Sequence, residues 1–99
     1  MRIHGTLKEL ILMPAKNFVI YKVTPKDIEK IDEMEKEVKT IKSGEVKDVK
    51  RVPIGFGIEI IKVGVIVDAN DDSAIERVAQ ELAGLETVED AEQESMTLL

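Results

Sequence analysis

The chain contains no cysteine, which excludes a disulfide framework and any metal site built from thiolates. A single histidine, His4, is too few for a histidine-rich metal site or a histidine-centred catalytic triad. Aromatic residues make up only 3% of the 99 residues, which argues against a stacking surface for single-stranded nucleic acid. No apolar run approaches the ~20 residues of a membrane-spanning helix. These absences predict a protein without a metal or a cofactor and without a membrane partner.

The chain also has fewer basic than acidic residues. Fourteen Lys and Arg residues face 20 Asp and Glu residues, so the formal net charge is −6. Binding to nucleic acid by neutralising phosphates is therefore not expected, and a basic partner protein suits this charge better. The N-terminal residues lack the apolar segment and cleavage site of a secretory signal, which predicts a cytoplasmic protein.

Four segments have the composition of β-strands. They are Phe18–Val23, 45–52 with irregular spacing that indicates a bulge, 58–68, and 87–99. The third of them alternates apolar residues on one face and is apolar on the other face too, which predicts a central strand.

Two segments have the apolar spacing of amphipathic helices. Thr24 and Pro25 predict the start of a helix near 25–42, and Ser43–Gly44 predicts its end. Ser73 and Glu76 have the spacing of a capping box for a second helix near 73–84. The side chains expected in the core are Ile28, Ile31, Met34, Val38, Val63, Val65, Ile75, Val78 and Leu82.

The predicted order of elements is β-α-β-β-α-β. With short connections and right-handed crossovers, this order gives an α+β fold: a four-stranded antiparallel sheet with two helices on one face.

The segment 52–58, Val-Pro-Ile-Gly-Phe-Gly-Ile, places one large aromatic residue between two glycines. Glycine permits positive φ angles and close backbone approach, so Gly55 and Gly57 can lift Phe56 clear of the sheet as an anchor for a partner. The alternative is that Phe56 packs into the core at a kinked strand entry.

Together with the segments 19–25 and 61–68, this motif makes the chain from about Met13 to Leu99 resemble translation elongation factor 1-beta of the archaeal type. It also resembles the C-terminal exchange domain of the eukaryotic counterpart. The resemblance implies a ferredoxin-like fold and a guanine-nucleotide exchange factor that promotes GDP release. Its partner would be elongation factor 1-alpha, the GTPase that delivers aminoacyl-tRNA.

The resemblance also implies where the partner binds. The aromatic residue of the motif docks on the GTPase, and a basic residue next to the C-terminus disturbs the magnesium site. The implied partner-binding residues here are Pro53, Ile54, Gly55, Phe56, Gly57, Met96, Leu98 and Leu99. Leu98 departs from the family, because it stands where eukaryotic members carry lysine, and an apolar side chain cannot compete electrostatically with Mg²⁺.

The chain carries no glycine-rich phosphate loop ending in Lys-Ser or Lys-Thr, and no set of nucleophile, base and orienting residue. We therefore expect an exchange factor and not an enzyme. Residues 13–99 are expected to form one exchange-factor domain. Residues 1–12 lie outside the resemblance and are expected to be a dispensable extension. The sequence does not indicate an oligomeric state.

Two other classes of protein share this order of elements. A small-molecule sensor or assembly module is the main alternative, although it would not need the segment 53–57 between its second and third strands. An RNA-binding domain would need paired aromatic residues on its central strands. Ile60, Ile61, Val63 and Val65 occupy those places instead.

Overall fold

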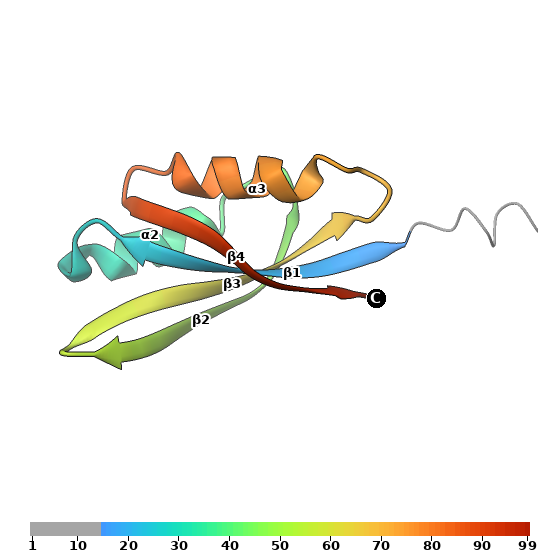
Figure 1. The fold of residues 1–99 in the computed structure, drawn as a ribbon. Helices are drawn as coiled ribbons and strands as arrows, with labels where there is room; N and C mark the ends of the chain where they lie inside the picture. Colours follow the sequence, from blue (N-terminus) through green and yellow to red (C-terminus); the bar gives the residue numbers. More distant parts are fainter. Residues whose placement is uncertain (1–14) are drawn as a thin grey trace, which may run out of the picture.

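Two helices cover one face of a four-stranded sheet in the structure, a computed structural model that describes residues 15–99 (Figure 1). The elements in chain order are β1 (Lys16–Pro25), the 3-10 turn η1 (Ile28–Lys30), α2 (Ile31–Val38), β2 (Glu45–Gly55), β3 (Ile58–Asp68), α3 (Ala74–Ala83) and β4 (Val88–Leu98). All neighbouring strands are antiparallel, in the order β2-β3-β1-β4. The predicted ferredoxin-like α+β fold is confirmed.

The core lies between the helices and one face of the sheet. Strand β3 is an inner strand, as its apolar character on both faces predicts, and its odd-numbered residues from 61 to 67 are buried. The helices add Ile31, Met34 and Val38 from α2 and Val78 and Leu82 from α3, all predicted to be buried.

Two expected core residues behave differently. Ile28 is 48% exposed, because it lies in η1 and not on the buried face of α2, so its predicted burial is wrong. Ile75 is only partly buried, although it packs against the core, and Ala74 is the buried residue at the start of α3.

The predicted start of the first helix at Thr24 and Pro25 is wrong. Both residues belong to β1, where Thr24 pairs with Asp90 and Pro25 with Val88 of β4. The helical turns begin after Asp27, whose carboxylate accepts a hydrogen bond from the Glu29 amide at 2.9 Å. Sheet pairing and the burial of Pro25 outweigh the local preference for a helix start.

The same helix also ends earlier than Ser43–Gly44 predicts. Helix α2 ends at Val38, and the chain turns at Thr40, whose amide and hydroxyl both donate to the Glu37 carbonyl. Gly44 has a different role, since a Cβ there would lie 2.5 Å from a methyl carbon of Val65. Glycine is needed at this position for close packing against β3.

The predicted capping box at Ser73 does not form either. Ser73 precedes α3 in a helical conformation, and its hydroxyl donates to Asp71 at 3.0 Å and accepts from no backbone amide of the helix. Arg77 donates to the same aspartate at 2.6 Å. The acidic turn before α3 is therefore held by local hydrogen bonds, as expected for aspartate in turns.

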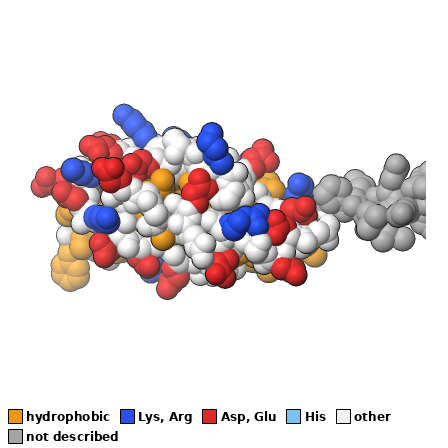
Figure 2. Space-filling model, turned by 90° about the horizontal axis from the view of Figure 1, so that it is seen from above, with side chains coloured by type: hydrophobic (Ala, Val, Ile, Leu, Met, Phe, Trp, Pro, Cys, Tyr) orange, Lys and Arg blue, Asp and Glu red, His pale blue; other side chains and the backbone are white. Residues whose placement is uncertain are grey.

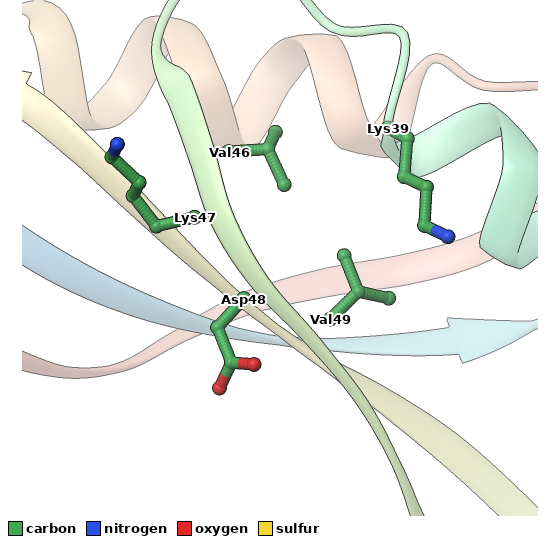
Figure 3. A pocket seen from close by; sticks show the side chains of 5 residues that line it. All are labelled: Lys39, Val46, Lys47, Asp48 and Val49. Atoms are coloured by element: carbon green, nitrogen blue, oxygen red, sulfur yellow. The ribbon is translucent and has the colours of Figure 1, made fainter.

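The bulge expected in the second strand is confirmed. The register of β2 against β3 shifts between Val46 and Asp48, which leaves Lys47 as the extra residue. Figure 3 shows Lys47 and Asp48 on one side of the β2 ribbon and Val46 and Val49 on the other. The bulge thus turns two consecutive side chains away from the helices.

Candidate partner-binding surfaces

Phe56 lies at the tip of the hairpin that joins β2 and β3, and it is completely exposed, at 102% of its reference area. Three consecutive residues have positive φ angles: 107° at Gly55, 57° at Phe56 and 75° at Gly57. Glycine adopts such angles without strain, whereas phenylalanine pays an energetic cost. The predicted projection of Phe56 is therefore confirmed, and the alternative that it packs into the core is wrong.

The residues around Phe56 extend its apolar surface. Ile54 is 55% exposed, and Pro53 and the two glycines are also exposed. A register shift between Pro53 and Gly55 ends the regular pairing with β3 just before the tip. Backbone geometry thus presents a small apolar tip with an aromatic side chain at its end.

The C-terminal segment forms a second exposed apolar surface. Met96, Leu98 and Leu99 are each at least half exposed, at 50%, 68% and 64%. This segment is not a free arm, since Leu98 pairs with Asn17 and the Leu99 amide donates to the Lys16 carbonyl at 2.8 Å. The sheet therefore fixes the position of the last residues.

The hairpin tip and the C-terminal segment lie at opposite ends of the sheet (Figure 1). Strand β3 runs from Ile58 beside the tip to Asp68, which pairs with Lys16 next to the C-terminal segment. Its 11 residues span roughly 33 Å at the usual rise per strand residue. The predicted partner-binding residues therefore form two separate groups, and a single small pocket cannot contact both.

An ion-pair network connects the base of the hairpin to α2. Arg51 of β2 donates through Nε to Glu35 at 2.7 Å and also bonds the carboxylate of Asp32. The hydrogen bond from Arg51 lowers the pKa of Glu35. The sequence alone could not reveal this contact, because it depends on how α2 crosses β2.

A shallow pocket of about 440 Å³ lies beside β2, away from both groups (Figure 3). Its lining residues are Lys39, Val46, Lys47, Asp48 and Val49. Two of the three charged side chains lie across the strand from the valines, so polar groups do not converge on one point as they do in a ligand site. Within residues 15–99, no group of three His, Asp or Glu side chains is placed to hold a metal ion.

Charged side chains of both signs are interspersed on the face shown in Figure 2. No helix in the described part of the chain is long and apolar enough to cross a membrane.

Comparison with known families identifies the family of this domain. The EF-1 guanine nucleotide exchange domain matches residues 18–99, which include every described strand and helix apart from the first two residues of β1. A comparison with curated proteins finds no match. The family match supports nucleotide exchange over the sensor and RNA-binding alternatives. The chain belongs to the family of EF-1 guanine nucleotide exchange domains, and it is an exchange factor acting on elongation factor 1-alpha.

Proposed function

We propose that this domain releases GDP by contacting elongation factor 1-alpha with both ends of its sheet. The hairpin tip, residues 53–57, anchors the domain through Phe56, and the C-terminal residues Met96, Leu98 and Leu99 act near the nucleotide. The complete exposure of Phe56 at positive φ carries the proposal, because an apolar ring held out at a backbone cost is typical of a partner anchor.

The separation of the two groups supports different roles for the hairpin tip and for the C-terminal residues. A partner that meets both must present contact regions roughly 30 Å apart, as a large GTPase can. An exchange factor acts by binding the nucleotide-free GTPase more tightly than the GDP-bound form. The tip can supply affinity for both forms, whereas contacts at the other end can favour the nucleotide-free form.

The C-terminal group acts by shape and not by charge in this proposal. Leu98 and Leu99 are apolar and exposed, and the sheet holds them in place. Side chains of this kind can displace neighbouring residues of the GTPase sterically, but they cannot take the place of a cation.

We also propose the type of family member, the cellular location and the bounds of the domain. The order and spacing of the motifs support the archaeal type of the family, and the work of the partner in translation supports a cytoplasmic location. Residues 13–99 form the exchange-factor domain in this proposal. Residues 1–12 lie outside the described residues and are proposed to be dispensable. No direct contact of the domain with nucleic acid or membrane is required.

Release of fluorescently labelled GDP from elongation factor 1-alpha tests the proposal. The wild-type chain should accelerate release, and Phe56→Ala should weaken binding by ~2 kcal/mol while leaving the melting temperature unchanged. Ile28→Ala is the matched control, because Ile28 is another exposed apolar residue outside both groups. Normal binding by Phe56→Ala would refute the anchor role, and a wild-type chain without any effect on release would refute the whole proposal.

A further inference from the structure

Three lysines form a row across the middle of the sheet face that the helices leave uncovered. Lys50 of β2 lies directly opposite Lys62 of β3, and Lys62 lies directly opposite Lys22 of β1. Lys22 and Lys62 each lie between two buried core residues of their strands. Strand alternation therefore turns both away from the helices, and register places Lys50 on the same face.

Both cross-strand pairs within this lysine row, Lys22, Lys50 and Lys62, join like charges. Like charges directly opposite one another on neighbouring strands are destabilising. Lys62 has an ion pair with Glu94 at 3.0 Å, but neither Lys22 nor Lys50 forms an ion pair with any residue from 15 to 99. Lys22 faces Glu92 of β4 and Lys62 contacts Glu94, so Lys50 is the lysine of the row without an acidic partner among residues 15–99. A residue that breaks a local rule commonly does so at a functional site.

Apolar side chains flank the lysine row on both sides. Toward the C-terminal end lie Phe18, Ile20 and Ile66, and the Phe18 ring packs over Gly64, where a Cβ would collide with it. Toward the hairpin lie Val52 and its partner Ile60. No helix covers this side of the sheet, and these side chains are partly exposed apart from Ile60, which is buried, so the face presents a partly apolar surface with a basic centre.

Glu94 of the edge strand β4 reaches Lys62, and the other acidic residues on this face lie toward its two edges. Glu92 pairs with Lys22 in the register of β4, and Asp48 pairs with Gly64 from the edge strand β2. The surface is therefore basic at its centre and more acidic toward its edges. A partner with carboxylates near the middle of its contact area and apolar side chains around them would complement it.

We propose that this uncovered face, centred on the lysine row, is a contact surface for a carboxylate-bearing region of elongation factor 1-alpha, lying between the two end contacts. The inference rests on the proposed function, since it extends the contact along the strands that join the hairpin tip to the C-terminal segment. The lysines contribute at short range, whereas the net charge of −6 acts on the partner as a whole at longer range.

Charge favours a carboxylate-bearing region of the GTPase over two other occupants of this face, a second copy of the chain and a nucleic acid. A second copy of the chain, packed symmetrically about the centre of this face, would place lysines of one copy against lysines of the other. A nucleic acid would bring a dense row of phosphates close to a protein with a net charge of −6 and to the acids at the edges of the face. A local group of carboxylates on a folded protein avoids both conflicts.

The test uses Lys50→Glu in the full chain, with Lys36→Glu as the matched control. Lys36 is exposed on α2, on the covered side of the sheet, and its replacement changes the net charge by the same amount. Glutamate at position 50 faces Lys62 and turns a repulsive cross-strand pair into an attractive one. The melting temperature of Lys50→Glu should therefore stay the same or rise.

Although Lys50→Glu should not destabilise the fold, it should weaken binding to the nucleotide-free GTPase. Lys50→Glu should raise Kd by about fivefold at ~50 mM salt, with a smaller effect at ~500 mM salt, and Lys36→Glu should change it less than about twofold. Lys22→Gln, which only removes a charge, should give a smaller loss than Lys50→Glu.

Three results would overturn the inference. One is equal Kd values for Lys50→Glu and the control while Phe56→Ala binds weakly, which would leave the proposed function standing. Another is a loss of binding to a tRNA probe in Lys50→Glu with unchanged GDP release, which would assign the row to nucleic acid. The third is concentration-dependent self-association of the wild-type chain that Lys50→Glu abolishes, which would assign this face to a second copy.

Discussion

Phe56 shows how single residues set the properties of the hairpin tip. The turn needs glycine on both sides of Phe56, because Gly55 and Gly57 also have positive φ angles, which residues with side chains rarely adopt. The side chain has no contact in the core, so selection for stability alone does not explain an aromatic residue at this position. The residue is therefore best explained by what it contacts outside the chain.

Tyr21 is the only tyrosine of the chain, and its hydroxyl donates to the Ile75 carbonyl at 2.8 Å. Burial raises the pKa of Tyr21 from 10.0 to about 12. The unfolded chain therefore loses its tyrosine proton first, and the folded state loses stability as pH rises from about 10 to about 12. Urea unfolding should show this decrease, and ultraviolet absorbance should report the single phenol directly.

Tyr21→Phe is the control for this titration. It should cost about 1 kcal/mol near neutral pH, through the lost hydrogen bond, and reduce the decrease in stability above pH ~10. An unchanged pH dependence in the variant would show that other groups cause the decrease.

Leu98→Lys should accelerate GDP release if the C-terminal group lies near the magnesium site. The change introduces an ammonium group that can compete for the carboxylates and phosphates around Mg²⁺. Leu98 is 68% exposed, so the fold should tolerate the change. Stopped-flow release of labelled GDP at fixed magnesium measures the effect, and slower release than wild type would contradict this placement of the C-terminal group.

Deletion of Leu98 and Leu99 is the companion experiment. It should reduce exchange without unfolding the domain, because it removes only the last pairing between β4 and β1. Exchange at the wild-type rate after deletion would show that Leu98 and Leu99 are not needed, and would leave the hairpin tip as the proposed contact.

At the scale of elements, carboxylates tie the helices to the loops around them. Glu37 of α2 accepts from the Thr87 amide and hydroxyl at 3.1 Å and 2.6 Å, just before β4 begins. Glu81 of α3 accepts from the Lys42 and Ser43 amides at 3.0 Å and 2.9 Å, and also from the Ser43 hydroxyl. These contacts fix the two helices relative to the ends of the strands.

Glu81→Gln should destabilise the domain by about 1–2 kcal/mol at neutral pH, because an amide replaces a charged acceptor of three hydrogen bonds. Burial raises the pKa of Glu81, but the hydrogen bonds from Ser43 and Lys42 outweigh this effect and lower it below 4.5. A carboxylate with a lowered pKa stabilises the fold above its unfolded pKa. The difference in free energy of unfolding between wild type and variant should therefore shrink as pH falls below about 4.5, and a constant difference would contradict the role of the charge.

At the scale of the whole molecule, residues 15–99 share one buried cluster. The buried cluster runs from Val19 to Val88 and draws on both helices and on β1, β3 and β4, while Val46 and Val49 of β2 are partly buried against it. Both groups of candidate contact residues also lie within residues 15–99. These observations support the proposal that residues 1–12 are dispensable for the fold and for its contacts with the GTPase.

A chain that starts at Met13 should keep the melting temperature and the exchange activity of the full chain. Differential scanning calorimetry and labelled-GDP release measure the two properties. A fall of several degrees would show that residues 1–12 stabilise the domain and are not a dispensable extension.

Local patterns in the sequence were enough to predict the structural features that depend on residues close together in the chain. Alternation in 58–68 predicts an inner strand, and the glycines around Phe56 predict its projection, because both effects act over a few residues. The order of elements then restricts the topology to the observed one. The identities of the candidate contact residues come from the resemblance, which is a property of the sequence as well.

Tertiary structure decided what depends on pairing between distant segments. Thr24 and Pro25 have the residue types of a helix start, but pairing with β4 keeps them in β1. The separation of the hairpin tip from the C-terminal group, and the alignment of Lys22, Lys50 and Lys62 in one row, follow from strand register. Register is set by the packing of a whole sheet face, so no local window of the sequence contains it.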